Sequence, residues 1–158
     1  MFILDSRVMS TGNSPQINLE PIRTPCIGVC STGIGDSVCR GCKRFSHEVI
    51  DWNGYTQEEK RFVDKRLSGF LSQACALKCT VTDRELLKWQ LDTQQVRYAA
   101  DHDEYCWLFQ LLRAGAGQIK DASKYGFRVH GDWADLTLLQ LRDQIDEDFW
   151  VLSTAHYD

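Results

Sequence analysis

The sequence has no long apolar run, and this absence excludes the largest class of membrane proteins. A helix that crosses a bilayer needs about 20 consecutive, mostly apolar residues. The apolar patch near the start, Phe2–Leu4, is interrupted at once by Asp5 and Arg7. A secretory signal needs a longer apolar stretch and a small-residue cleavage site. We therefore expect a cytoplasmic protein that does not enter a membrane.

The common catalytic motifs are also missing. The chain contains no H-E-x-x-H, no E-x-x-H and no G-x-S-x-G, so zinc-protease, di-iron carboxylate and serine-hydrolase chemistry lack their residues. The segment GAGQIK, residues 115–120, lacks the spacing of a phosphate-binding loop. These absences leave enzyme activity open but make a non-catalytic role the first hypothesis.

The chain has fewer basic than acidic side chains, 18 against 22. The formal net charge is −4, and the deficit lies in the second half: residues 1–70 carry nine basic and eight acidic side chains, and residues 71–158 carry nine and fourteen. This balance argues against a general nucleic-acid binder and favours a protein partner, with nucleic acid as the weaker alternative. The acidic run Asp143 and Asp146–Asp148 predicts a solvated helix face or, alternatively, a contact for a basic partner.

Cysteine is the residue that the chain does supply. Seven are present, an odd number, and four of them lie in the segment PCIGVCSTGIGDSVCRGCKR, residues 25–44. These four are Cys26, Cys30, Cys39 and Cys42, spaced as C-x3-C and C-x2-C with eight residues between the pairs. In a reducing compartment, such a cluster is more typical of metal binding than of disulfides.

Two close pairs suit a tetrahedral metal site, because each short loop presents two thiolates to one ion. Zinc with four thiolates has a net charge of −2, as has an oxidised four-iron cluster, so the nearby Arg40, Lys43 and Arg44 would favour either. Both pairs fit zinc-type spacing, and the run matches neither common ferredoxin pattern. The prediction is one four-cysteine centre, holding zinc or an iron–sulfur cluster, with the three cations as a possible partner contact.

The segment is also similar to a known family. PCIGVC…CRGCKR, followed by EVIDW and YTQEEKRFVDKRL, resembles the bacterial family catalogued as domain of unknown function 1289, over about residues 24–70. The resemblance implies an iron–sulfur protein, since members are usually labelled so. Arg44 occupies the place of the arginine expected two residues after the last cysteine. The positions that carry the resemblance are Pro25, Cys26, Cys30, Cys39, Cys42, Trp52, Thr56, Glu59 and Arg66.

The other three cysteines are predicted to pack in the core. Cys75 and Cys79 lie beside an apolar helical stripe, and free cysteine behaves as a small buried hydrophobe. Cys106 belongs to the same category. The alternatives are a reactive Cys75–Cys79 dithiol, or a second metal site with Cys106 and one histidine.

The pattern of apolar residues predicts a mainly helical fold: a small four-cysteine knuckle followed by about four helices. Thr56 and Glu59 form a capping box that begins the first helix, and Thr82 and Glu85 repeat it for a helix that runs to about Ala99. Further helices are expected over residues 103–114 and 138–152, and a short strand within residues 124–133. We divide the chain into a flexible lead (1–20), the four-cysteine module (21–70) and a helical domain (71–158).

The sequence supports two alternative functions. A saturated four-cysteine centre predicts a non-catalytic structural or interaction module. An iron–sulfur cluster predicts instead an electron carrier or redox sensor that serves a partner enzyme.

Overall fold

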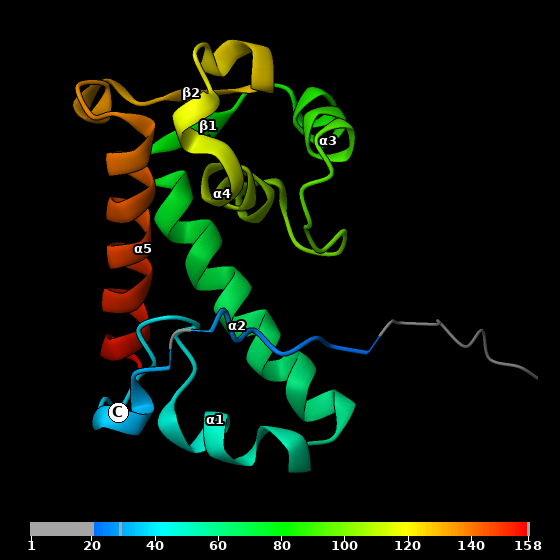
Figure 1. Cartoon of the computed structure of the whole chain (residues 1–158), viewed down its shortest axis with the longest axis vertical. Helices are drawn as coiled ribbons and strands as arrows, with labels where there is room; N and C mark the ends of the chain where they lie inside the picture. Colours follow the sequence, from blue (N-terminus) through cyan, green and yellow to red (C-terminus); the bar gives the residue numbers. More distant parts are fainter. Residues whose placement is uncertain (1–20, 29, 158) are drawn as a thin grey trace, which may run out of the picture.

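The computed structural model describes residues 21–28 and 30–157, and this part of the chain is mainly α-helical, as predicted (Figure 1). The expected N-terminal lead, residues 1–20, lies outside the described residues. The α-helices are α1 (Ser46–Asp51), α2 (Gln57–Ala76), α3 (Arg84–Thr93), α4 (Glu104–Gly115) and α5 (Leu138–Ala155). Two strands, β1 (Cys79–Val81) and β2 (Phe127–Val129), complete the regular structure together with short 3₁₀ turns.

The long helix α2 begins where the sequence predicts. Thr56 Oγ1 accepts a hydrogen bond from the Glu59 amide at 3.1 Å, and Glu59 Oε1 accepts one from the Thr56 amide at 2.8 Å. This reciprocal pair satisfies two amides that the helix itself leaves without partners. Thr137 and Gln140 repeat the arrangement at the start of α5.

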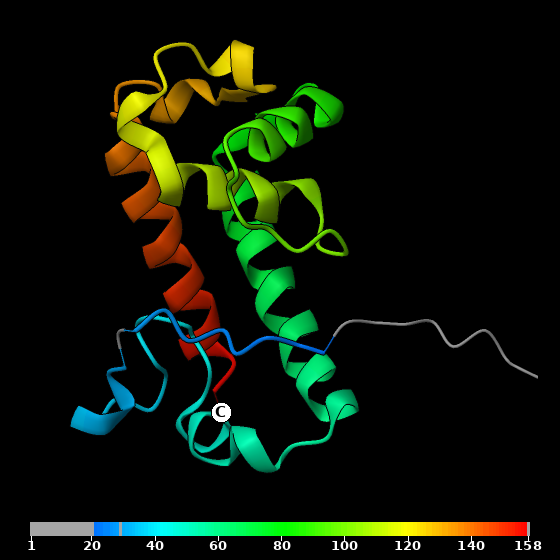
Figure 2. The ribbon, with the colours of Figure 1, turned by 45° about the vertical axis from the view of Figure 1, so that its right-hand side comes forward.

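Helices α2 and α5 run along each other, and Figures 1 and 2 show them side by side from two directions. Helix α4 packs across α2 near its C-terminal half. The core lies between these three helices, where Leu67, Trp107 and Ile145 are buried. None of the described helices is long and apolar enough to cross a membrane.

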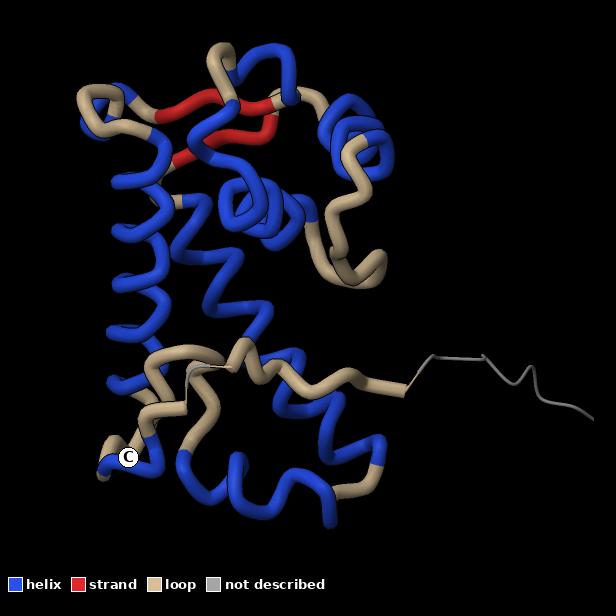
Figure 3. Tube along the Cα trace, in the orientation of Figure 1, coloured by secondary structure: helices blue, strands red, loops and turns tan. Residues whose placement is uncertain are grey.

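A two-stranded antiparallel sheet closes one end of the molecule (Figure 3). β2 lies inside the predicted strand segment, whereas β1 has no counterpart among the predicted elements. The turn before β2 depends on Gly126, whose φ is +82° and whose carbonyl accepts from the Thr82 and Asp83 amides. A β-carbon at Gly126 would lie 2.4 Å from the Asp83 carbonyl oxygen, so only glycine fits there.

Two predicted boundaries around α3 are wrong. The N-cap is Asp83, whose carboxylate accepts from the Leu86 amide at 3.0 Å, and not Thr82. The helix ends at Thr93 rather than near Ala99, because Gln95 adopts φ +59° and turns the chain.

The end of the molecule opposite the sheet carries the four-cysteine segment. Here α1 and the loops around it meet the last turns of α5 (Figures 1 and 2). Phe45 lies edge-on to Tyr157 with ring centroids 5.3 Å apart, and Phe70 lies 4.6 Å from the His156 ring. The C-terminal residues after α5 therefore pack against α2 and against the residue that precedes α1.

Candidate metal centre

Residues 38–45 fold into a tight turn that brings Cys39 and Cys42 together. Val38 and Phe45 form an antiparallel bridge, the Cys39 amide donates to the Arg44 carbonyl at 2.9 Å, and the Lys43 amide donates to the Cys39 carbonyl at 2.8 Å. Lys43 takes φ +67°, which is uncommon for a residue other than glycine. We call residues 38–45 the knuckle turn.

Backbone amides surround the Cys39 sulfur. Burial alone would raise the pKa of Cys39, but backbone hydrogen bonds from Cys42, Ser31 and Gly41 stabilise the thiolate and lower the pKa to about 7. The Cys42 thiol also hydrogen-bonds Cys39, which places the two sulfurs within reach of each other. Thiolate is the form that ligates metal, so the surroundings of Cys39 favour the form that would bind an ion.

The Cys42 sulfur receives a side-chain donor instead. Arg44 Nε donates to Cys42 Sγ at 3.2 Å. Burial raises the pKa of Cys42, and the Arg44 guanidinium opposes that rise through its hydrogen bond and its charge. Arg44 is itself 3% exposed and lies 4.9 Å above the Trp52 ring, which fixes its side chain.

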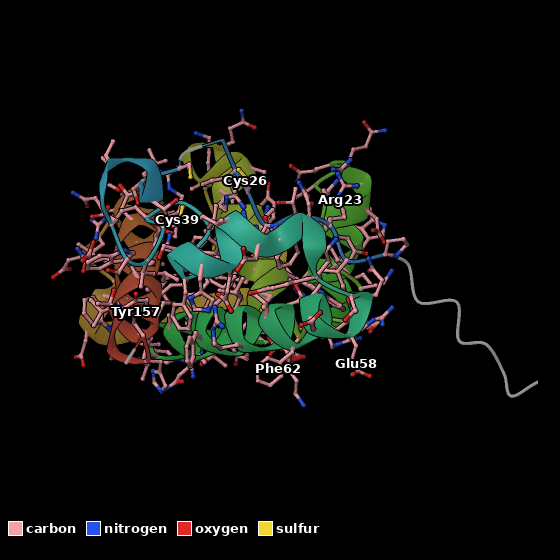
Figure 4. All side chains as sticks on the ribbon, turned by 90° about the horizontal axis from the view of Figure 1, so that it is seen from below. Arg23, Cys26, Cys39, Glu58, Phe62 and Tyr157 are labelled. Carbon is pink, nitrogen blue, oxygen red and sulfur yellow. The ribbon has the colours of Figure 1, made fainter. Side chains whose placement is uncertain are left out.

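The first pair lies on the neighbouring segment and is exposed. The Gly28 amide donates to Cys26 Sγ at 3.4 Å, and Cys30 Sγ lies 3.2 Å from Thr32 Oγ1. Ser31, the residue after Cys30, connects the two segments because its Oγ accepts from the Arg40 amide at 2.8 Å. Figure 4 shows this end of the molecule with Cys26 and Cys39 labelled.

Within residues 21–28 and 30–157, no group of three or more His, Cys, Asp or Glu side chains is arranged to hold a metal ion. The knuckle turn thus brings together two of the four predicted ligands, Cys39 and Cys42, and the full set stays a prediction. The donor chemistry of this half fits a thiolate-bound metal: two adjacent sulfurs, both buried, both receiving N–H donors.

The three predicted contact cations point in different directions. Arg40 is half exposed, with 46% of its side chain accessible, whereas Lys43 and Arg44 are buried. Lys43 Nζ donates to the carbonyls of Arg40 and Gly41 at 2.6 and 3.2 Å, and to Asp146 Oδ1 at 2.5 Å. Two of the three cations therefore turn inward and face the chain itself.

Helix α5 supplies residues that the sequence does not connect with the cysteines. Asp146 pairs with Lys43, and Glu147 pairs with Arg40 at 3.3 Å. The Arg40 guanidinium also lies 4.1 Å above the Trp150 ring. Asp148 of the same run pairs with buried Lys78. Much of the acidic run is thus occupied by cations of its own chain, and no sequence signal indicates these pairings.

An ion pair connects α1, the helix that follows the knuckle turn, to α2. The two terminal guanidinium nitrogens of Arg66, Nη1 and Nη2, donate to the Glu48 carboxylate at 2.7 Å, and Glu48 Oε1 also accepts from the Phe45 amide at 2.8 Å. Burial alone would raise the pKa of Glu48, but these donors more than offset it and hold the pKa below its ordinary value. The knuckle turn therefore leads into a helix whose start is fixed by a charged pair.

The remaining cysteines lie in the core, as predicted. Cys75, Cys79 and Cys106 are at most 2% exposed, and Cys75 and Cys79 are hydrogen-bonded to each other. Cys106 Sγ donates to the Ser68 carbonyl at 3.2 Å, and burial raises the pKa of its thiol to about 12. They are placed as buried hydrophobes, whereas His47, five residues after Cys42, is exposed.

Comparison with known proteins gives one result. No curated protein and no solved structure matches the chain. The sequence model of one family, described as Protein of unknown function (DUF1289), matches residues 24–70. That range contains the four clustered cysteines, α1 and most of α2, and it ends before α5. Residues 24–70 of this chain are thus similar to the DUF1289 family, in agreement with the resemblance noted in their pattern of cysteine, tryptophan and arginine.

Proposed function

We propose that this protein is a small metal-binding protein whose centre is structural rather than catalytic, with Cys26, Cys30, Cys39 and Cys42 as the ligands. The observation that carries the proposal is the knuckle turn. Its two adjacent, buried sulfurs receive N–H donors from the backbone and from Arg44. A buried thiolate pair is costly unless a cation compensates it, and a divalent ion does so directly.

A structural role for the metal is supported by the weak packing of the segment that carries Cys26 and Cys30. Cys26, Ile27 and Cys30 are exposed, and so is Ile34 in the turn that follows, so this segment buries little apolar surface. Free energy of metal binding becomes free energy of folding where ligands come from a weakly packed segment. In this proposal, the metal attaches the 26–30 loop to the knuckle turn.

The identity of the metal separates the two candidate functions. Zinc saturated by four thiolates has no open position for a substrate and serves structure. An iron–sulfur cluster would supply one-electron chemistry instead, and the N–H groups on Cys39 and Cys42 are contacts of the kind that set its potential. These hydrogen bonds are the specific observation that keeps the electron carrier or redox sensor as the second candidate.

The deciding experiment is purification without air, followed by a visible spectrum and by measurement of zinc, iron and sulfide per chain. One zinc in a colourless protein supports the structural centre. Stoichiometric iron and sulfide in a brown protein support the electron carrier. A chain that holds neither, and takes up neither on reconstitution, would contradict both.

Matched variants locate the metal. Cys39→Ser should lower the bound metal by at least tenfold, since it removes one buried ligand. Cys106→Ala, which changes a cysteine buried in the core between α2 and α4, should leave metal content unchanged. Equal metal content in the two variants would show that the metal is held elsewhere.

We also propose a cytoplasmic location and a protein partner. Four thiolate ligands persist best in a reducing compartment. Burial of Lys43 and Arg44 leaves Arg40 as the exposed cation of the three, which weakens the case for nucleic acid. The exposed Ile27 and Ile34 beside the cysteines favour a protein surface instead.

A further inference from the structure

The knuckle turn rests on one short stretch of α5, the five residues from Asp146 to Trp150. Lys43 Nζ binds Asp146 and lies 5.3 Å from the centre of the Phe149 ring. Arg40 binds Glu147 and lies over Trp150. These contacts join positions more than 100 residues apart in the sequence.

The Lys43 side chain stabilises the conformation of the knuckle turn as well as its position on α5. The buried ammonium reaches the carbonyls of Arg40 and Gly41, which lie inside the turn that presents Cys39 and Cys42. Its third donor goes to Asp146. Lys43 also has the positive φ of the turn, a conformation that must be held by its surroundings. Asp146 therefore balances the charge on which the turn depends.

We propose that α5 is the built-in partner of the knuckle turn, and that seating of the turn on α5 and metal uptake at its cysteines are coupled through the Lys43–Asp146 pair. The segment that matches the DUF1289 model, residues 24–70, then needs a helix outside that range to hold its metal-presenting turn in place. The metal half of this inference rests on the proposed function, whereas the seating half does not.

The direction in which Asp146→Asn changes metal affinity shows whether Asp146 acts by holding the turn or only by its negative charge. A carboxylate near thiolates repels them, so if Asp146 acted only through its charge, Asp146→Asn would strengthen metal binding. If Asp146 holds the turn through Lys43, the same substitution leaves a buried ammonium without its counter-ion, loosens the turn and weakens binding. Asp146 is thus assigned as a positioning residue.

The test compares Asp146→Asn with Asp143→Asn in the full chain. Both remove one negative charge from α5, but the carboxylate of Asp143 is bound by Arg142 of the same helix. Zinc affinity is measured without air by competition with a chromophoric chelator. We expect at least a tenfold loss for Asp146→Asn, no loss for Asp143→Asn and partial recovery with Asp146→Glu. Unchanged or tighter zinc binding in Asp146→Asn would overturn the coupling.

A second measurement needs no metal. In the metal-free protein, hydrogen exchange of the Cys39 and Lys43 amides reports the turn directly, because both donate within it. We expect faster exchange of these two amides in Asp146→Asn and wild-type exchange in Asp143→Asn. If wild-type protein binds no metal, the proposed function fails, and this comparison alone decides the seating. Equal exchange in all three proteins would overturn the seating.

Discussion

Arg66 and Glu48 meet through two hydrogen bonds of 2.7 Å, so that one guanidinium of α2 binds both oxygens of a carboxylate of α1. The side chains are 17% and 7% exposed, and the Arg66 guanidinium lies 4.0 Å above the Phe45 ring. Phe45 is the last residue of the knuckle turn and precedes α1 directly. A two-pronged ion pair therefore connects the turn to the long helix.

This geometry predicts that Arg66→Lys is not a conservative change. Lysine offers a point charge and cannot reproduce two parallel hydrogen bonds or the planar contact with Phe45. We expect a loss of about 1–3 kcal/mol in the free energy of unfolding, measured by urea denaturation. Lys65→Gln, a change at the neighbouring exposed position, is the control and should alter stability by less than about 0.5 kcal/mol. Equal stability of the two variants would show that the pair contributes little.

His102 predicts a pH dependence of stability. Its hydrogen bond with Asp64, at 2.8 Å, is the main cause that raises the pKa of His102 above 6.5; burial opposes the rise, and Asp101 and Asp103 add to it. A raised pKa in the folded state stabilises the protein below about pH 6.5, and this contribution is lost as the pH rises through the folded value.

The corresponding variant is His102→Gln. Between pH 6 and pH 9, the free energy of unfolding in urea should fall by about 1 kcal/mol more for wild type than for His102→Gln. His47→Gln, at an exposed histidine, should follow wild type. A variant as pH-dependent as wild type would remove His102 as the cause.

Two glycines predict stability changes of opposite sign. Gly126→Ala forces a β-carbon against the Asp83 carbonyl in a turn with φ +82°, so we expect a loss of about 2–3 kcal/mol. Gly69 lies inside α2 with open space around it, and Gly69→Ala should add about 0.5–1 kcal/mol because alanine favours the helix. Thermal unfolding followed by circular dichroism compares them, and a stable Gly126→Ala protein would contradict the turn geometry.

Thiol reactivity tests the two cysteine environments. In native metal-free protein, Ellman's reagent should modify Cys26 and Cys30 quickly and the five buried cysteines slowly, which gives two fast thiols per chain. If the proposed centre forms, stoichiometric zinc should abolish the fast phase. Cys26→Ser should halve it in the metal-free protein, whereas Cys75→Ala should leave it intact. A fast phase that zinc does not change would speak against Cys26 and Cys30 as ligands.

Local signals in the sequence predicted much of the fold. Thr56 and Glu59 identify the start of α2 because a capping box acts within four residues. Thr82 and Asp83 are both common N-cap residues, so the local sequence does not choose between them, and the structure shows that Asp83 caps α3. The end of α3 was missed because nothing local marks Gln95 for a positive φ.

At the candidate site too, the features that depend on neighbouring residues could be predicted, and those that depend on residues far along the chain could not. The C-x2-C spacing predicts that Cys39 and Cys42 meet, since a short turn leaves few other arrangements. The burial of Lys43 was not predictable, because its counter-ion Asp146 lies 103 residues away and charge patterns carry no distance information. The sequence predicts that the cations near the cysteines and the acidic run both face outward, whereas Arg40 and Lys43 pair with Glu147 and Asp146 of that run.

The distance between Lys43 and Asp146 along the chain has a consequence during synthesis. A ribosome that adds about 5–20 residues per second needs roughly 5–20 s to proceed from the knuckle turn to the helix that supports it. During that interval, the nascent thiols are translated and α5 is not. The newly made cysteines are therefore open to a metal donor, or to an oxidant, before the fold can shelter them.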